Sequence, residues 1–202
     1  SLAAVMPSVS PAGDSMNSTS PEMIRAVTQK WNGDRDSRGR PLVPDDILER
    51  MKLVTSEEAW GTCKRNGYSF QFAGDWMNLP PERVVVGRAV TCRWVPRRPD
   101  VHDSIDRQGE EDDRVGFQNS WVIDELETND LIVVDLFGKV FNGTFAGDNL
   151  ATAIKSRSGT GMVIDGGIRD TQRILEMDEF NAFVRGVDPS AILDVSMVEI
   201  NG

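Results

Sequence analysis

The first third of the chain alternates between polar stretches and short segments with helix signals. Residues 1–20 are rich in Ser, Pro, Ala, Gly and Asn and have no apolar period, which predicts a flexible leader. Ser20-Pro21 places an N-cap residue before a proline, so we expect a helix from Pro21 to about Trp31. The polar residues 32–40 that follow predict a loop.

The middle of the chain contains one strong helix signal and one strong strand signal. Thr55-Ser56-Glu57-Glu58 is a capping-box sequence, and Gly67 is placed to end the helix that it opens. The β-branched residues of Arg83–Cys92 predict a strand. Residues 96–118 are polar and strongly acidic, which predicts a solvated loop, and Asn119 is placed to cap a short helix that ends at about Leu126.

The last third has the pattern of alternating strands and helices. Leu131–Asp135 predicts a buried strand, Asp148 to about Arg157 has helical spacing, and Met162–Asp165 predicts a second strand. A strand, a helix and a strand in succession indicate a crossover between parallel neighbours. Further predicted elements are a helix from Asp170 to about Met177, a strand over 180–184 and a turn at Asp188-Pro189.

This order of elements predicts an α/β fold with a partly parallel sheet. Val134-Asp135 and Ile164-Asp165 each end an apolar run before glycine, so we expect both loops at the same edge of the sheet, where open α/β sheets bind ligands. We divide the chain into a leader (1–20), an N-terminal helical elaboration (21–80) and an α/β domain (81–202).

The net charge limits the partners that this chain can attract. The formal charge is −10 over 202 residues, so RNA, DNA and anionic membrane surfaces are repelled on average, although a local basic patch remains open. A protein of this charge that handles small anions needs concentrated positive charge. A bound metal ion with one or two arginines supplies it.

Cysteine and histidine are too rare for the metal sites that depend on them. Cys63 and Cys92 form no CxxC pattern, which disfavours a disulfide framework and predicts a reducing, cytoplasmic location. His102 is the only histidine, so a two-histidine zinc motif is excluded and oxygen ligands remain. The chain has no run of about 18 apolar residues, residues 1–6 lack the basic flank of a signal peptide, and a processed upstream segment remains open.

The candidate site lies on two consecutive turns of the predicted crossover. Asp148 opens the helix and Arg169-Asp170 follows the next strand, so their side chains can converge. The N–H groups of Asn149 and Leu150, at a helix N-terminus, can receive a carboxylate, and Gly147 permits close approach.

Ordinary structural roles explain the same residues almost as well. Asp148 and Asp170 both stand where an N-cap aspartate is common, and Arg169 can be a surface ion-pairing residue. Gly166 and Gly167 can be simple turn formers.

Two segments of this region resemble the RraA-like family, which includes the 4-hydroxy-4-methyl-2-oxoglutarate aldolases. They are Gly147-Asp148-Asn149-Leu150-Ala151-Thr152-Ala153-Ile154-Lys155 and Val163-Ile164-Asp165-Gly166-Gly167-Ile168-Arg169-Asp170. The family signature is an acidic residue, twenty intervening residues and Arg-Asp, and 149–168 supplies that spacing. The resemblance implies an α/β/α sandwich of the swivelling-domain type with a mixed, partly parallel sheet. Longer members are often labelled demethylmenaquinone methyltransferases, but this chain has no glycine-rich methyl-donor loop.

The resemblance also implies roles for individual residues. Asp170 would ligate Mg²⁺ or Mn²⁺, Arg169 would contact the substrate, residues 147–150 would bind its carboxylate, and Asp148 would hold a metal-bound water. The implied activity is a class II, metal-dependent cleavage of 4-hydroxy-2-oxo acids to pyruvate, with decarboxylation of oxaloacetate at the same site. A Schiff base on Lys155 is the rival aldolase strategy, and nothing in the sequence points to a depressed pKa for that lysine.

Other functions remain open on the same resemblance. The family also contains trimeric regulators that bind and inhibit a ribonuclease without catalysis, and a different lyase or hydrolase could use the same scaffold. Trimers or hexamers are implied for this chain. It ends at Gly202, just after 195–200, where family members continue, and no equivalent is evident for the acidic residue that a neighbouring subunit supplies in related aldolases.

Overall fold

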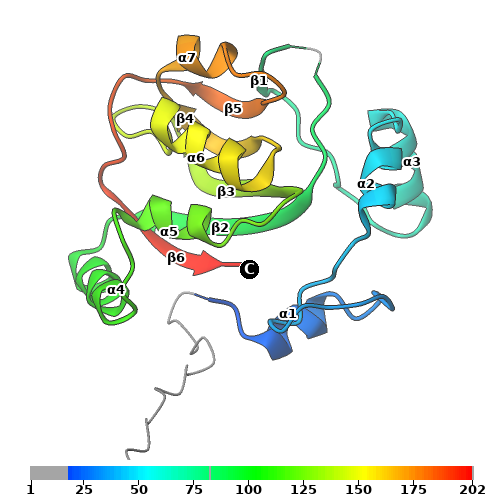
Figure 1. Ribbon diagram of the computed structural model, residues 1–202, viewed down its shortest axis with the longest axis horizontal. Helices are drawn as coiled ribbons and strands as arrows, with labels where there is room; N and C mark the ends of the chain where they lie inside the picture. Colours follow the sequence, from blue (N-terminus) through cyan, green and yellow to red (C-terminus); the bar gives the residue numbers. More distant parts are fainter. Residues whose placement is uncertain (1–17, 82, 202) are drawn as a thin grey trace, which may run out of the picture.

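A six-stranded mixed sheet forms the centre of the computed structural model, which describes residues 18–81 and 83–201 (Figure 1). The strand order is β1-β5-β4-β3-β2-β6. The four inner strands are parallel, and β1 and β6 lie antiparallel at the two edges. The strands are β1 (Met77–Leu79), β2 (Arg88–Pro96), β3 (Asp130–Lys139), β4 (Met162–Ile168), β5 (Ala182–Val187) and β6 (Val195–Ile200). The predicted α/β fold with a partly parallel sheet is confirmed.

Seven helices are described, and three of them lie across one face of the sheet (Figure 1). These three are α5 (Gln118–Asp124), α6 (Asp148–Ser158) and α7 (Thr171–Leu175); the others are α1 (Pro21–Val27), α2 (Asp45–Met51), α3 (Ser56–Arg65) and α4 (Pro99–Glu111). None of the helices in the described ranges is long and apolar enough to cross a bilayer.

The core lies between that sheet face and the three covering helices. Side chains that alternate along the inner strands, such as Ile132, Ile164 and Val184, are completely buried there. Ala151 and Ile154 of α6, three residues apart on one face of the helix, pack against them. Their neighbours on the opposite sheet face, such as Val133, are only half-buried. The apolar runs of the sequence therefore correspond to the strands that α6 connects and covers.

Several elements form as their sequences predict. Ser20 caps α1 by accepting from the Met23 amide, and Thr55 and Glu58 form both hydrogen bonds of the predicted capping box at α3. Gly159 ends α6 in the left-handed conformation with φ of +71°. The crossover from β3 through α6 to β4 joins parallel neighbours, as expected. The proposed leader lies outside the described residues for positions 1–17.

The solvated loop predicted over 96–118 was wrong, because 99–111 form the 13-residue helix α4. Pro99 begins it, and only Ile105 and Gly109 are buried. Gly109 lies under the ring of Trp121, where a Cβ would be 2.3 Å from Cη2. The buried stripe is too narrow to stand out among the acidic residues. The sequence interpretation also predicted no helix at the position of α2.

Strand ends were placed too early in the sequence interpretation. Asp135 and Asp165 do not end their strands but face each other in the parallel register of β3 and β4. Gly166 and Gly167 belong to β4 and are not turn formers. Strand β2 begins at Arg88, five residues later than expected, and extends to Pro96.

Helix α5 also differs from its predicted start. Asn119 is the second residue of α5 instead of its cap, and its buried amide donates to the Phe145 carbonyl over 2.7 Å. This bond ties the start of α5 to the segment that precedes α6.

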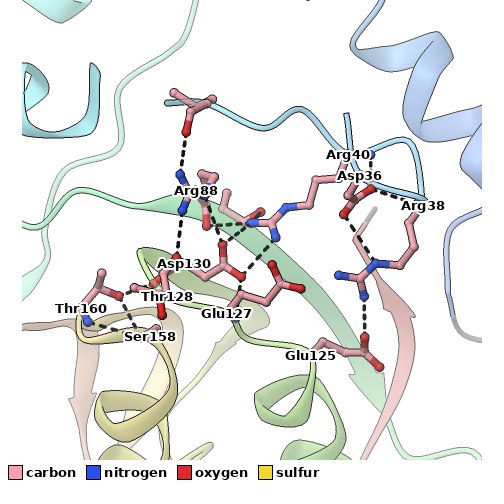
Figure 2. A network of polar contacts seen from close by, with 12 residues as sticks. Asp36, Arg38, Arg40, Arg88, Glu125, Glu127, Thr128, Asp130, Ser158 and Thr160 are labelled. Atoms are coloured by element: carbon pink, nitrogen blue, oxygen red, sulfur yellow. Dashed lines mark hydrogen bonds and ion pairs between the residues drawn. The ribbon is translucent and has the colours of Figure 1, made fainter. Parts of the chain in front are cut away.

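An ion pair holds the N-terminal segment against the sheet, as Figure 2 shows. The guanidinium of Arg40 donates to both carboxylate oxygens of Asp130, over 2.8 and 3.1 Å. It also donates to the carbonyls of Arg88 and Ala89 at the start of β2. Both side chains are buried, so residues 34–42 are fixed to the end of the sheet at which strands β2 and β3 begin.

Candidate metal and substrate site

A short segment before α6 runs beside the end of β4 and positions the candidate site. Ala146 and Ile168 form a parallel bridge, and the Arg169 amide donates to the Ala146 carbonyl over 3.0 Å. One step earlier, the Phe145 amide donates to the Gly167 carbonyl over 2.8 Å. This pairing places Gly147 directly beside Arg169 and Asp170.

Gly147 leaves no room for a side chain between itself and these two residues. A Cβ at this position would lie 2.3 Å from Asp170 Oδ2 and 2.7 Å from Arg169 Nε. Both distances are shorter than real Cβ contacts, so only glycine lets the two side chains approach the backbone here. The predicted close approach at Gly147 is therefore made by the protein's own side chains.

Asp170 turns its carboxylate toward the N-terminus of α6. Oδ2 accepts from Arg169 Nε over 3.1 Å and from the Asp148 amide over 3.4 Å. Oδ1 has no hydrogen-bond partner among the described residues, and the side chain is 40% exposed. The backbone of Asp170 is left-handed, with φ of +57°, and its side chain makes no capping bond to α7. Asp170 therefore occupies the predicted N-cap position of α7, but its side chain does not cap that helix.

An amide in the first turn of α6 is hydrogen-bonded to the side chain of Asp148, in the same turn. Gly147 is the N-cap, and Asp148 is the first helical residue instead of the cap. Asp148 Oδ1 accepts from the Asn149 amide over 2.8 Å, so that N–H group is not open to a ligand in this structure. The Leu150 amide has no hydrogen-bond partner within residues 18–81 and 83–201, while its side chain packs against the core. Of the two N–H groups expected to bind a substrate carboxylate, only that of Leu150 is free to do so in the described structure.

Arg169 keeps most of its hydrogen-bonding capacity. Only Nε is engaged, by Asp170, and the two terminal nitrogens have no partner in the described part of the chain. The side chain is 32% exposed. A guanidinium in this state can bind a carboxylate through its two outer N–H groups.

The oxygen donors at this site fit a hard divalent cation such as Mg²⁺ or Mn²⁺ better than zinc or copper. Within the described ranges, no three His, Cys, Asp or Glu side chains gather closely enough to hold a metal by themselves. Mg²⁺ commonly uses one or two carboxylates and completes its shell with waters and substrate oxygens. The accessible Asp170 carboxylate, with its open Oδ1, fits that mode and would be the protein ligand.

Two other groups named from the sequence lie away from this position. Lys155 is in the last turn of α6, about 10 Å along the helix from Asp148 at 1.5 Å per residue. Asp165 pairs with Arg185 over 2.6 Å, and the Arg185 guanidinium stacks 3.8 Å above the Trp76 ring. A cavity of about 480 Å³ lies between α4 and the start of β6, and no predicted site residue lines it.

Comparison with known proteins finds a family model that matches most of this chain. The family model described as RraA-like, Aldolase/RraA, matches residues 57–201. Among solved structures, Streptomyces coelicolor RraAS2, described as an unusual member of the RNase ES inhibitor RraA protein family, is similar with a TM-score of 0.64 at 23% identity. That match covers 80% of this chain and 72% of the other.

Two further structures share the fold at lower identity. A structure described among novel cellulases from microbes of the gut ecosystem has a TM-score of 0.64 at 19% identity, covering 88% of this chain and 74% of the other. An uncharacterised protein from Pseudomonas syringae pv. tomato has a TM-score of 0.60 at 16% identity, covering 84% and 68%. No curated protein matches the chain.

Proposed function

This chain belongs to the Aldolase/RraA family, and from that premise we propose that it is a divalent-metal-dependent lyase for small 2-oxo acids. Its substrates would be 4-hydroxy-2-oxo acids of the 4-hydroxy-4-methyl-2-oxoglutarate type, cleaved to pyruvate, and oxaloacetate, which it would decarboxylate. The supporting observation is the contact of Gly147 with the side chains of Arg169 and Asp170.

The two side chains divide the binding of the substrate between them. Asp170 would hold Mg²⁺ or Mn²⁺, which supplies Lewis-acid polarisation of the 2-oxo and carboxylate oxygens when bound. The outer N–H groups of Arg169 would bind the same end of the substrate, together with the Leu150 amide at the positive end of α6. Only a compact anion with adjacent oxygens can use all of these groups together.

The chemistry requires stabilisation of one developing charge. In the retro-aldol step the C3–C4 bond breaks, its electron pair moves toward the 2-oxo oxygen, and the 4-hydroxyl loses its proton. The fixed charge of Arg169 stabilises the oxygen on which negative charge accumulates. Asp148 would hold a water that takes up the proton and returns it to C3. Decarboxylation of oxaloacetate develops charge on the same oxygen and needs the same group.

A regulatory function is the alternative that the family leaves open. The similar S. coelicolor structure is named for an RNase inhibitor family, and its 23% identity shows a shared fold only. A protein-binding regulator has no need for Asp170 to keep an open oxygen beside a guanidinium whose two terminal nitrogens are free in the described part of the chain. We propose that the chain assembles as a homotrimer or homohexamer in either case, with no nucleic acid or membrane partner.

Production of pyruvate tests the catalytic proposal. The 202-residue protein is incubated with Mg²⁺ and either 4-hydroxy-4-methyl-2-oxoglutarate or oxaloacetate, and pyruvate is followed through NADH oxidation by lactate dehydrogenase. We expect pyruvate formation that EDTA stops and added Mg²⁺ or Mn²⁺ restores. Asp178→Asn is a matched control for substitutions at Asp170, because Asp178 is exposed and lies outside the site. A wild-type protein that is inert on both substrates would contradict the proposal.

A further inference from the structure

The cavity of about 480 Å³ has the size of a small-molecule site and is separate from the Asp170 site. Helix α4 forms one wall, the segment before β6 another, and α5 with the end of β2 the floor. Its polar lining residues are Arg97, His102, Asp106, Glu110, Arg114, Gln118, Asn119 and Asp194; its apolar ones include Trp94, Phe117, Trp121 and Ile192. None of this was expected from the sequence, where 96–118 was predicted to be a loop.

Helix α4 presents a regular row of polar side chains to the cavity. His102, Asp106 and Glu110 are each four residues apart, so they lie on one face of the helix, and all three line the cavity. The helix is fixed from behind, because Gly109 packs under the Trp121 ring. This acidic face is therefore held in place at the cavity.

His102 is locked by hydrogen bonds and serves as part of the wall. Nδ1 lies 2.9 Å from Ser196 Oγ and 3.4 Å from Gln118 Nε2. The Gln118 carbonyl accepts from the Met197 amide, and Gln118 Nε2 donates to Asp106 Oδ1 over 2.8 Å. His102 Nε2 lies 3.3 Å from Asp106 Oδ2, so His102 and Gln118 together orient the Asp106 carboxylate.

This serine, histidine and aspartate do not form a hydrolase triad. Ser196 is fully buried and does not line the cavity, so its hydroxyl cannot reach a ligand there. The carboxylate of Asp106, in contrast, is about half exposed. The arrangement orients a binding wall and offers no nucleophile.

The floor of the cavity offers packing surface and few free polar groups. Trp121 lines it and is 6% exposed, and its Nε1 has no acceptor among the described residues but is itself shielded from the cavity. Asn119 is 4% exposed, and its amide nitrogen donates to the Phe145 carbonyl. An apolar ring would fit against such a floor.

The charge of the lining selects the ligand. Asp106, Glu110 and Asp194 contribute three carboxylates and Arg97 and Arg114 two guanidinium groups. Arg114 pairs over 2.8 Å with Glu125, which lies outside the cavity and is shared with Arg38. Even with both arginines counted in full, the lining carries a net negative charge, so the cavity disfavours the anionic substrates proposed for the Asp170 site and favours a cation.

We propose that this cavity binds a small organic amine that carries an apolar ring. The ammonium group would lie against Glu110 and Asp194, and the ring against the apolar lining. This proposal does not rest on catalysis at Asp170, and it stands or falls independently of that activity.

Three probes that share a phenol ring and differ in net charge test the proposal. They are tyramine, its neutral alcohol analogue 4-(2-hydroxyethyl)phenol, and the anionic 4-hydroxyphenylacetate. Each is titrated into the 202-residue protein labelled with ¹⁵N-tryptophan, and the indole N–H signals are followed by NMR. The Trp121 signal is assigned as the one that Trp121→Phe removes. We expect tyramine to shift it saturably, the alcohol to bind more weakly, and the anion to bind at least about tenfold more weakly than tyramine.

Glu110→Gln and Glu111→Gln form a matched pair for the charge. Glu110 lines the cavity, whereas Glu111 is exposed, adjacent and outside it. We expect Glu110→Gln to weaken tyramine binding about three- to fivefold and Glu111→Gln to leave it unchanged. Circular dichroism confirms that both variants fold. The proposal is overturned if no probe shifts the Trp121 signal saturably, if the anion binds as well as the amine, or if the two variants bind alike.

Discussion

The carboxylate of Asp170 lies so close to the backbone of Gly147 that a Cβ at Gly147 would be only 2.3 Å from Oδ2. Gly147→Ala must therefore displace the Asp170 and Arg169 side chains, which are flexible enough to turn away without unfolding the protein. We expect a loss of pyruvate formation of about 10²-fold, because a displacement of about 1 Å in a positioned group has that effect. The thermal unfolding midpoint should change little.

Gly74→Ala is the control for this substitution. A Cβ at Gly74 would meet its nearest neighbour, Phe72 Cε1, at an ordinary 3.5 Å. Wild-type activity in Gly74→Ala together with lost activity in Gly147→Ala supports the contact. Full activity in Gly147→Ala would remove the observation on which the proposed site rests.

Substitutions of Asp170 and Arg169 should impair the proposed activity in different ways. Asp170→Asn removes the charged ligand, so we expect no metal-dependent turnover and a loss of Mn²⁺ binding measured by electron paramagnetic resonance. Arg169→Ala should retain Mn²⁺ binding while kcat/KM falls on the order of 10²-fold, as for loss of a donor to a developing oxyanion. If Arg169→Ala lost the metal and Asp170→Asn retained it, the assigned roles would be reversed.

The buried ion pair of Arg40 and Asp130 should stabilise the fold by attaching the N-terminal segment to the sheet. Asp130→Asn leaves a buried guanidinium without its counter-ion, so we expect urea unfolding to show a loss of about 3 kcal/mol. Glu49→Gln, which breaks the exposed pair with Lys52, should change stability by less than about 1 kcal/mol. Equal effects of the two substitutions would show that residues 34–42 are not held by this pair.

The two cysteines should differ strongly in reactivity. Burial raises the pKa of the Cys92 thiol to about 12, while Cys63 lies half-buried on α3. At pH 8 the native protein should release one equivalent of thionitrobenzoate from Ellman's reagent quickly, and Cys63→Ser should abolish that phase. The thiolate fraction of Cys92 is lower by on the order of a thousandfold than that of a free cysteine. Rapid modification of both thiols before denaturation would contradict the burial of Cys92.

The fold was predictable where local patterns and tertiary packing agree. The capping box of Thr55 and Glu58 and the apolar runs of β3 and β4 appear as expected. Helix α4 was not predictable, because its buried face consists of little more than Ile105 and Gly109, and the acidic remainder resembles a solvated loop. Gly166 suggested a turn, whereas it lies in β4 and permits close packing there. A Cβ added at Gly166 would be 2.7 Å from Leu136 Cδ2.

The proximity of the candidate site residues was predictable, but their geometry was not. Sequence spacing named Gly147, Asp148, Arg169 and Asp170, and the structure brings these four together. The direction of each side chain depends on the bridge between Ala146 and Ile168, which joins residues 22 positions apart. Local propensity carries no information on such a contact, so the left-handed backbone of Asp170 and the closed amide of Asn149 were not foreseen.

The left-handed backbone of Asp170 sets activity against thermal stability. A residue with a Cβ loses roughly 1 kcal/mol in this conformation, somewhat less for Asp, and glycine loses none. Asp170→Gly should therefore unfold at the wild-type temperature or above it while losing its metal ligand. Calorimetry and the pyruvate assay on that one variant would give opposite results. A search for thermostable variants that ignored turnover would select against the site, because its key residue is a poor choice for its own backbone.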